Sequence, residues 1–290
     1  MRLGKHVLVS GLAILFGIMV MLVAGCGDDE STTPTTITGS LNDPEFVVLK
    51  GQIDDFVDST VSFFKNGLNT VNGISEFGDI IPQYAVVPEQ QDTWDTTFTA
   101  DGWYQINIAY THRDAEGDPV WQTSLHDSIQ YRLNDAVLMS NFNTRDELVY
   151  KHHWTFDVED ETVTYASFAG AVDLTFDDLN STLSTLTGTR DFSAHTQTVT
   201  NDSTVCRDFT FAADVNNITL RYSGVTGWSQ CPTTGSISAI IEMVYQKDDD
   251  DPVTTTWNVS MTFFSGTMSA SVTRGNTVWS YTSDVCVLPQ

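Results

Sequence analysis

The sequence predicts a mainly β fold, in which an N-terminal helix packs on a large antiparallel meander that curls into a barrel or half-barrel. One stretch with helical spacing lies near the start of the chain, from about Pro44 to Gly67 or Gly73. From about Trp94 onward, apolar and polar residues alternate with a period of two, and short polar turns separate the runs. About ten to twelve strands are expected, and a sheet of that size does not easily stay flat and open.

The helix is predicted from its cap and from its apolar spacing. Asp43 suits the N-cap, Pro44 the first helical position and Glu45 the positive end of the helix dipole. The apolar residues at helical spacing are Ile53, Phe56, Val57, Val61, Phe64, Leu68 and Val71. Gly67 or Gly73 ends the helix. We expect it to pack on the sheet, with a lid or a partner-binding helix as the functional alternative.

The strands are predicted from alternation along the rest of the chain. The clearest runs are 104–110, 148–158, 209–211, 218–222, 237–245, 257–263, 268–272 and 279–281. Turn signals lie at 114–119, 141–144, 157–161, 215–217, 247–252 and 274–276. Because each run is apolar on one side only, we expect one face of the sheet to be buried. The runs are too polar for an outer-membrane barrel, which needs a continuous lipid-facing band.

The charge balance of the chain is strongly acidic. It has 13 Lys and Arg against 38 Asp and Glu, a formal net charge of −25. This balance argues against nucleic acid as a partner and against electrostatic docking on anionic lipid. Hydrophobic residues make up 41% of the chain and aromatic residues 11%, which is enough for a packed core and argues against global disorder.

The first residues have the pattern of a bacterial export signal. Arg2 and Lys5 precede an apolar run at 7–23, and the run ends in Leu22, Val23, Ala24, Gly25 and Cys26. This ending resembles the lipobox of bacterial lipoproteins. The resemblance implies a thioether-linked diacylglycerol on Cys26, cleavage before it, and acylation of the new amino terminus. An ordinary signal peptide and an uncleaved anchor are the alternatives.

The chain is therefore expected to have three parts. Residues 1–25 are the lipoprotein signal peptide, 26–43 an acylated flexible tether, and 44–290 the helix-plus-meander domain. The tether is rich in Thr, Ser and Gly and has hardly any apolar residues. The lipoprotein resemblance places the protein in the bacterial cell envelope. Gly27 stands where an inner-membrane retention signal has Asp, which favours the outer membrane. The acidic run 28–30 is similar to surface-export signals, so a periplasmic and a surface location both stay open.

Three cysteines follow Cys26, at positions 206, 231 and 286. Export permits disulfides, and the odd number leaves one thiol unpaired. Counting hairpins places all three at the same end of the sheet, and the chain-entropy gain hardly distinguishes the pairings. Cys231 and Cys286 bracket a four-strand unit, so we prefer Cys231–Cys286, with Cys206–Cys231 as the alternative.

Few residues suggest metal binding. Asp114, Glu116 and Asp118 alternate within a turn and weakly resemble a calcium loop, but the later Glu of an EF-hand is absent. A solvated turn is the better interpretation. His152 and His153 are adjacent in a predicted strand and therefore face opposite sides, so they do not chelate one metal. His152 is expected to be a hydrogen-bonded histidine on the apolar face.

The sequence contains no Gly-x-Ser-x-Gly elbow, phosphate loop, dinucleotide fingerprint or His-Glu-x-x-His motif. We expect a non-enzymatic, membrane-anchored envelope lipoprotein with no cofactor. Its expected partners are the membrane, through the acyl chains on Cys26, and an apolar small molecule or an envelope protein. One helix followed by a long meander is similar in order to the half-barrel carriers that ferry lipoproteins across the periplasm, and curled sheets enclose ligand cavities. A surface adhesion or structural module is one alternative, and a hydrolase without a recognisable motif is another.

Overall fold

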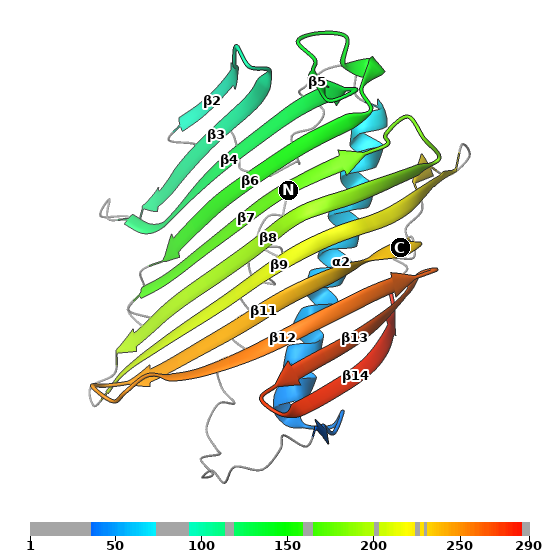
Figure 1. Ribbon diagram of the computed structural model, residues 1–290. Coiled ribbons are helices and arrows are strands. Elements are labelled where there is room, and N and C mark those ends of the chain that lie inside the picture. Colours follow the sequence, from blue (N-terminus) through cyan, green and yellow to red (C-terminus); the bar gives the residue numbers. More distant parts are fainter. Residues whose placement is uncertain are drawn as a thin grey trace, which may run out of the picture.

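The computed structural model describes residues 36–73, 93–113, 119–158, 165–199, 203–223, 227–228 and 231–285. One long helix lies against a 14-stranded sheet (Figure 1). The elements in chain order are β1 (Ile37–Thr38), α2 (Pro44–Gly73), β2 (Thr93–Phe98), β3 (Trp103–Arg113), β4 (Pro119–Leu133), β5 (Ala136–Val137), η3 (Phe142–Thr144), β6 (Glu147–Val158), β7 (Tyr165–Asp177), β8 (Leu183–Val199), β9 (Thr204–Ser223), β10 (Gly227–Trp228), β11 (Thr234–Lys247), β12 (Val253–Phe264), β13 (Thr267–Arg274) and β14 (Thr277–Asp284).

The sheet is a meander with two free ends. Its order is β1-β14-β13-β12-β11-β9-β8-β7-β6-β4-β3-β2, and β10 and β5 pair with β9 and β4 beside this path. All pairs are antiparallel except that of β1 with β14. The prediction of a helix on a large antiparallel meander is confirmed. A closed barrel, one of the predicted forms, is wrong, because β1 and β2 lie at opposite edges and do not pair.

Helix α2 begins where the sequence predicts. The backbone N–H of Glu45 donates to Asp43 Oδ1 at 3.0 Å, and the N–H of Val47 donates to the Asp43 carbonyl at 2.9 Å. Asp43 is therefore the N-cap, and it satisfies amide groups that have no partner inside the helix. The predicted apolar positions beyond Val61 lie in the helix, but their side chains lie outside the described part of the chain.

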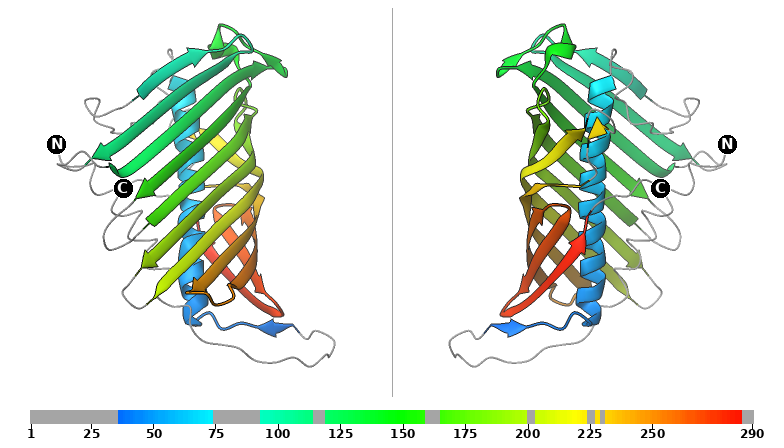
Figure 2. Two further views of the ribbon diagram at one scale, coloured as in Figure 1. Left: turned by 90° about the vertical axis from the view of Figure 1, so that its left-hand side faces the viewer. Right: turned by 90° about the vertical axis from the view of Figure 1, so that its right-hand side faces the viewer.

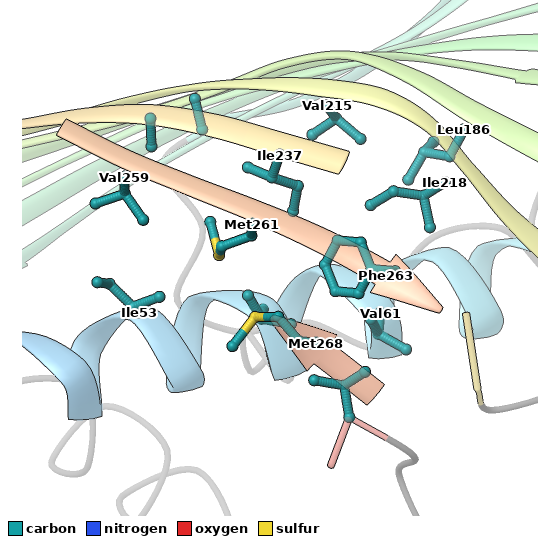
Figure 3. Close-up of a cluster of buried hydrophobic side chains, with 14 of the residues drawn as sticks. Ile53, Val61, Leu186, Val215, Ile218, Ile237, Val259, Met261, Phe263 and Met268 are labelled. Carbon is teal, nitrogen blue, oxygen red and sulfur yellow. The ribbon is translucent and has the colours of Figure 1, made fainter. Parts of the chain in front are cut away.

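The main core lies between α2 and one face of the sheet, which we call the inner face (Figure 2). The apolar side of α2 is almost fully buried, at no more than 1% exposure, through Phe46, Leu49, Ile53, Val57 and Val61. Against them pack strand residues that include Ile237, Val259, Met261, Phe263 and Met268 (Figure 3). Burying this many large side chains is the main stabilising contribution to the helix–sheet contact.

Polar and aromatic contacts fix the direction in which α2 crosses the sheet. Phe46 near its start stacks on Trp279 of β14, with ring centroids 5.5 Å apart. Further along, Phe56 lies 4.2 Å from Phe211 of β9, measured between ring centroids. Ion pairing of Glu45 with Arg274 adds a link to β13. From the N-terminal end of α2 onward, the described side chains thus contact first β14 and β13 and then β9 in the middle of the sheet.

One predicted turn is wrong. The turn signal at 215–217, which contains Asn216 and Asn217, predicts a break between two strands, but β9 runs without interruption from Thr204 to Ser223. The register against β8 shifts there, because Leu186 pairs with Ile218 whereas Gly188 pairs with Val215. Two residues of β9 therefore oppose one of β8, which is a β-bulge. Asn217, at φ 49°, takes the left-handed conformation that Asn tolerates well.

Candidate functional site

A cluster of aromatic side chains lies on the inner face, at the ends of β6 to β9. We call it the aromatic cluster; its members are Trp154, Phe156, Val158, Ala166, Phe168, Phe192, Ala194 and Phe209. Ring centroids lie 5.9 Å apart for Trp154–Phe192, 6.1 Å for Phe156–Phe168 and 6.0 Å for Phe192–Phe209. These spacings are those of attractive tilted ring pairs.

The aromatic cluster differs from the main core in burial and in position. Trp154, Phe156, Phe192 and Phe209 are only half-buried, so their rings retain accessible apolar surface. The strand ends that carry them lie at the lower left of Figure 1, whereas α2 crosses behind the strands farther to the right. The cluster is therefore a second apolar region of the inner face, beside the part that the helix packs against.

A buried polar group borders the aromatic cluster. Asp127 of β4 is 2% exposed and accepts two hydrogen bonds through the same oxygen, Oδ1. Tyr150 donates its hydroxyl at 2.9 Å, and His152 donates from Nδ1 at 2.6 Å. Burying a carboxylate is costly unless hydrogen bonds compensate it, so these two donors account for its place in an apolar face. Because His152 and Trp154 are two residues apart in one strand, the polar group lies directly next to the aromatic cluster.

Arg190 continues this polar row across β8. Val172 of β7 pairs with His152 on one side and with Arg190 on the other, so the three residues lie in one row across the strands. The guanidinium of Arg190 donates to Thr60 Oγ1 of α2 at 2.6 Å and lies 4.9 Å from the ring centroid of Phe56. Burial lowers the pKa of Arg190 to about 10 from its usual 12.5. The inner face thus joins a half-buried aromatic surface to a row of buried groups that form strong hydrogen bonds.

Carboxylates gather at the opposite strand ends. Burial is the largest cause of a raised pKa at Asp177. Repulsion from the neighbouring carboxylates raises this pKa further, and the positive charge of Arg132 opposes the change. These carboxylates are Asp178, Asp135 and Asp146. Burial likewise raises the pKa of Glu147, although this carboxylate pairs with Arg132 at 3.0 Å. This crowding of like charges stores repulsion in the folded state at neutral pH.

Several residues singled out in the sequence lie outside the described part of the chain: Cys26, Cys286, and the weak calcium candidates Asp114, Glu116 and Asp118. The preferred Cys231–Cys286 bridge therefore stays a prediction. Cys206 carries a free thiol, so the alternative Cys206–Cys231 bridge is not formed in this structure. Within the described residues, no three His, Cys, Asp or Glu side chains gather in a way that would hold a metal ion.

The interpretation of the histidine pair is confirmed. His152 is 9% exposed on the inner face and hydrogen-bonded, whereas His153 is exposed on the opposite face. Asp127, the hydrogen-bond partner of His152, was not predicted from the sequence. Asp127 interrupts an alternating run of Leu125, Ile129 and Tyr131 on the inner side of β4. A carboxylate at an apolar position of a strand is the signal that would have found it.

Comparison of the chain with protein-family models, with curated proteins and with solved structures finds no match. Along the described residues, no helix is both long enough and apolar enough to span a membrane.

Proposed function

We propose that this protein is a non-enzymatic lipoprotein of the bacterial cell envelope that binds a ligand with an apolar chain on its aromatic cluster. In this proposal the twisted sheet acts as a half-barrel around α2, and acyl chains on Cys26 hold the protein to a membrane. The observation that carries it is the half-buried aromatic surface of Trp154, Phe156, Phe192 and Phe209, beside a core that the helix already fills. Ligand sites are mostly apolar with a few placed polar groups, as this region is.

The polar row supports a ligand with a head group as well as a chain. Asp127, His152 and Arg190 stand one row away from Trp154 and Phe192. Each is buried or nearly so and is already oriented by a hydrogen bond. A ligand whose chain lies on the rings would bring its polar end next to these groups. Preoriented groups bind with a smaller loss of conformational entropy.

The ligand part of the proposal is tested on the full-length protein purified from membranes. Native mass spectrometry and organic extraction should both recover a bound apolar molecule. The variants Phe156→Ala and Phe209→Ala remove ring surface from the cluster, and we expect each to lower occupancy about tenfold or more. Thr256→Ala, an exposed change on the other face of β12, serves as the matched control. A chain recovered without any ligand, or equal occupancy in all variants, contradicts the proposal.

The anchor is tested separately, by the intact mass of the membrane-extracted protein beside a Cys26→Ala variant. A mass matching residues 26–290 plus acyl chains supports the lipoprotein proposal. An unacylated chain that begins later means ordinary secretion, and the variant should then behave like the wild type. Diacyl attachment gives firm membrane binding because each buried methylene contributes about 0.8 kcal/mol.

A surface adhesion module is the second candidate, and the outer side of the last strands favours it. Exposed Ser and Thr side chains there pair across strands, as in Ser238–Ser260 and Thr262–Ser269. Protease treatment of intact cells separates the two candidates. A surface module should be cleaved, whereas a periplasmic binding protein should be protected.

A further inference from the structure

A furrow of about 680 Å³ lies on the outer face of the sheet, the face turned away from α2. Its lining comes from β2, β3, β4, β6, β7, β8 and β9, which are adjacent in the sheet. Seven strands at the usual spacing span about 29 Å. The furrow is therefore long and runs across the strands, and no part of the aromatic cluster's inner surface is needed to form it.

Strand register fixes which side the furrow is on. The lining contains two rows of outward-facing residues and one inward-facing row between them. The inward row, which includes Trp154, Gly170 and Phe192, thus contributes its backbone as the floor. The first outward row is Asn107, His126, His153, Ala171, Asp191 and Ala212. The second carries the hydroxyls of Ser124, Thr155, Ser193 and Thr210.

Small side chains make the middle of the furrow deep. On β7, Ala169 and Ala171 face outward on either side of Gly170. On the inner side, Trp154 lies where a Gly170 side chain would be, because an added Cβ would stand 2.2 Å from its Nε1. A larger residue at Gly170 would push Trp154 away, so the thin floor depends on this glycine.

The walls present hydrogen-bonding groups that are partly fixed in place. His126 donates from Nδ1 to Asn107 Oδ1 at 2.5 Å, and its Nε2 lies 3.0 Å from the hydroxyl of Ser128. His153 is exposed on the next strand, with its ring centroid 6.5 Å from that of His126. Asp191 is exposed two strands farther on, beyond Ala171. Acceptors and donors thus stand above a floor formed by the backbone of the inward row and the methyl groups of the outward-facing alanines.

We propose that this furrow binds a neutral polysaccharide chain lying across the strands. Sugar rings offer C–H faces to the alanine floor, while their hydroxyls bond to Asp191, His153 and the Ser and Thr row. The described lining contains one carboxylate and no Lys or Arg, so it is not built for a polycation or a polyanion. The net charge of −25 further disfavours acidic polymers. This site is independent of the apolar ligand on the inner face.

The test uses the full-length protein in detergent, titrated calorimetrically with cellohexaose, maltohexaose and the N-acetylglucosamine hexamer. Ala171→Leu fills the furrow without adding charge, and Asp191→Ala removes its one carboxylate. Thr256→Ala is the control, outside the furrow on β12. We expect at least one hexamer to bind, its trimer to bind more weakly, and both furrow variants to lose about tenfold in affinity. Urea midpoints check that each variant is folded.

Three results would overturn the proposal. The first is no heat of binding from any of the three hexamers at millimolar concentration. The second is hexamer binding that Ala171→Leu leaves unchanged, since the sugar would then lie elsewhere. Displacement of a bound hexamer by a basic peptide would also count against it, because it would assign the furrow to a different class of ligand.

Discussion

Removing the Tyr150 hydroxyl, which donates to the buried Asp127 carboxylate, should lower the free energy of unfolding only when that carboxylate is present. Tyr150→Phe removes the hydroxyl that donates to Asp127 Oδ1 at 2.9 Å and leaves the ring in place. Hydrogen bonds to charged groups contribute about 1.5–3 kcal/mol when both partners are buried. Tyr150 is 6% exposed and Asp127 is 2% exposed, so screening by water is small. We expect the free energy of unfolding to fall by about 2 kcal/mol.

The assay is a double-mutant cycle by urea unfolding. Asp127→Ala alone should cost about 3 kcal/mol or more, because Tyr150 and His152 both lose this partner. In the Asp127→Ala background, Tyr150→Phe should cost almost nothing, so the coupling energy should be about 2 kcal/mol. Tyr165→Phe is the matched control, since its hydroxyl donates to Asp157 at 3.3 Å at an exposed site and should change stability by less than about 0.5 kcal/mol.

Additive effects would refute this reasoning. If Tyr150→Phe costs the same with and without Asp127, the hydroxyl does not stabilise the carboxylate. A Tyr165→Phe cost equal to that of Tyr150→Phe would also contradict the argument from burial.

Four further substitutions follow from the packing and the charges. Ile53→Ala, at a fully buried helix position, should lower the free energy of unfolding by about 2–5 kcal/mol in urea, and a loss near zero would mean that α2 does not pack on the sheet. Gly188→Ala should destabilise by more than about 2 kcal/mol, because φ is +141° and the new Cβ would stand 2.0 Å from the Asp173 carbonyl oxygen. Gly51→Ala, whose Cβ meets nothing within 4 Å, should instead raise the free energy of unfolding by about 0.5–1 kcal/mol, and equal effects of the two glycine changes would contradict the geometry. The raised pKa of Asp177 means that the folded state binds more protons than the unfolded state above pH 3.8, so stability falls as pH rises through this window. The urea midpoint should therefore drop less between about pH 4 and pH 7 in Asp177→Asn than in the wild type, and parallel pH profiles would count against the repulsion.

The helix and the strand alternation were predictable because each is set by local physics. Asp43 and Pro44 are typical of a helix start, and the apolar residues from Ile53 to Val61 recur at helical spacing. The helix and its buried side therefore follow from the sequence. The period-two runs fix which residues share a face. His152 could be placed on the apolar side for that reason alone.

Features that depend on the partner strand were not predictable. Asn216 and Asn217 look like a turn, and only the pairing of β9 with β8 makes them a bulge inside a strand. In the sequence, Asp127 is a carboxylate at an apolar position of a strand. Its hydrogen bonds to Tyr150 and His152 become visible only when β6 is paired with β4. The outer furrow likewise needs the register of seven strands before His153 and Asp191 are seen to share one row.

The contacts of α2 with β13 and β14 join the first long element of the chain to its last two strands. Glu45 meets Arg274 across a separation of 229 residues, and Asp54 meets Tyr281 across 227. Contacts between such distant positions require a large loop to close before any stabilisation is gained, which makes folding slow. The apolar side of α2 therefore has no complete partner until the whole sheet has emerged and paired. Removal of the final hairpin should expose the part of that side around Phe46, which stacks on Trp279, so part of the stability of the helix is controlled from the opposite end of the chain.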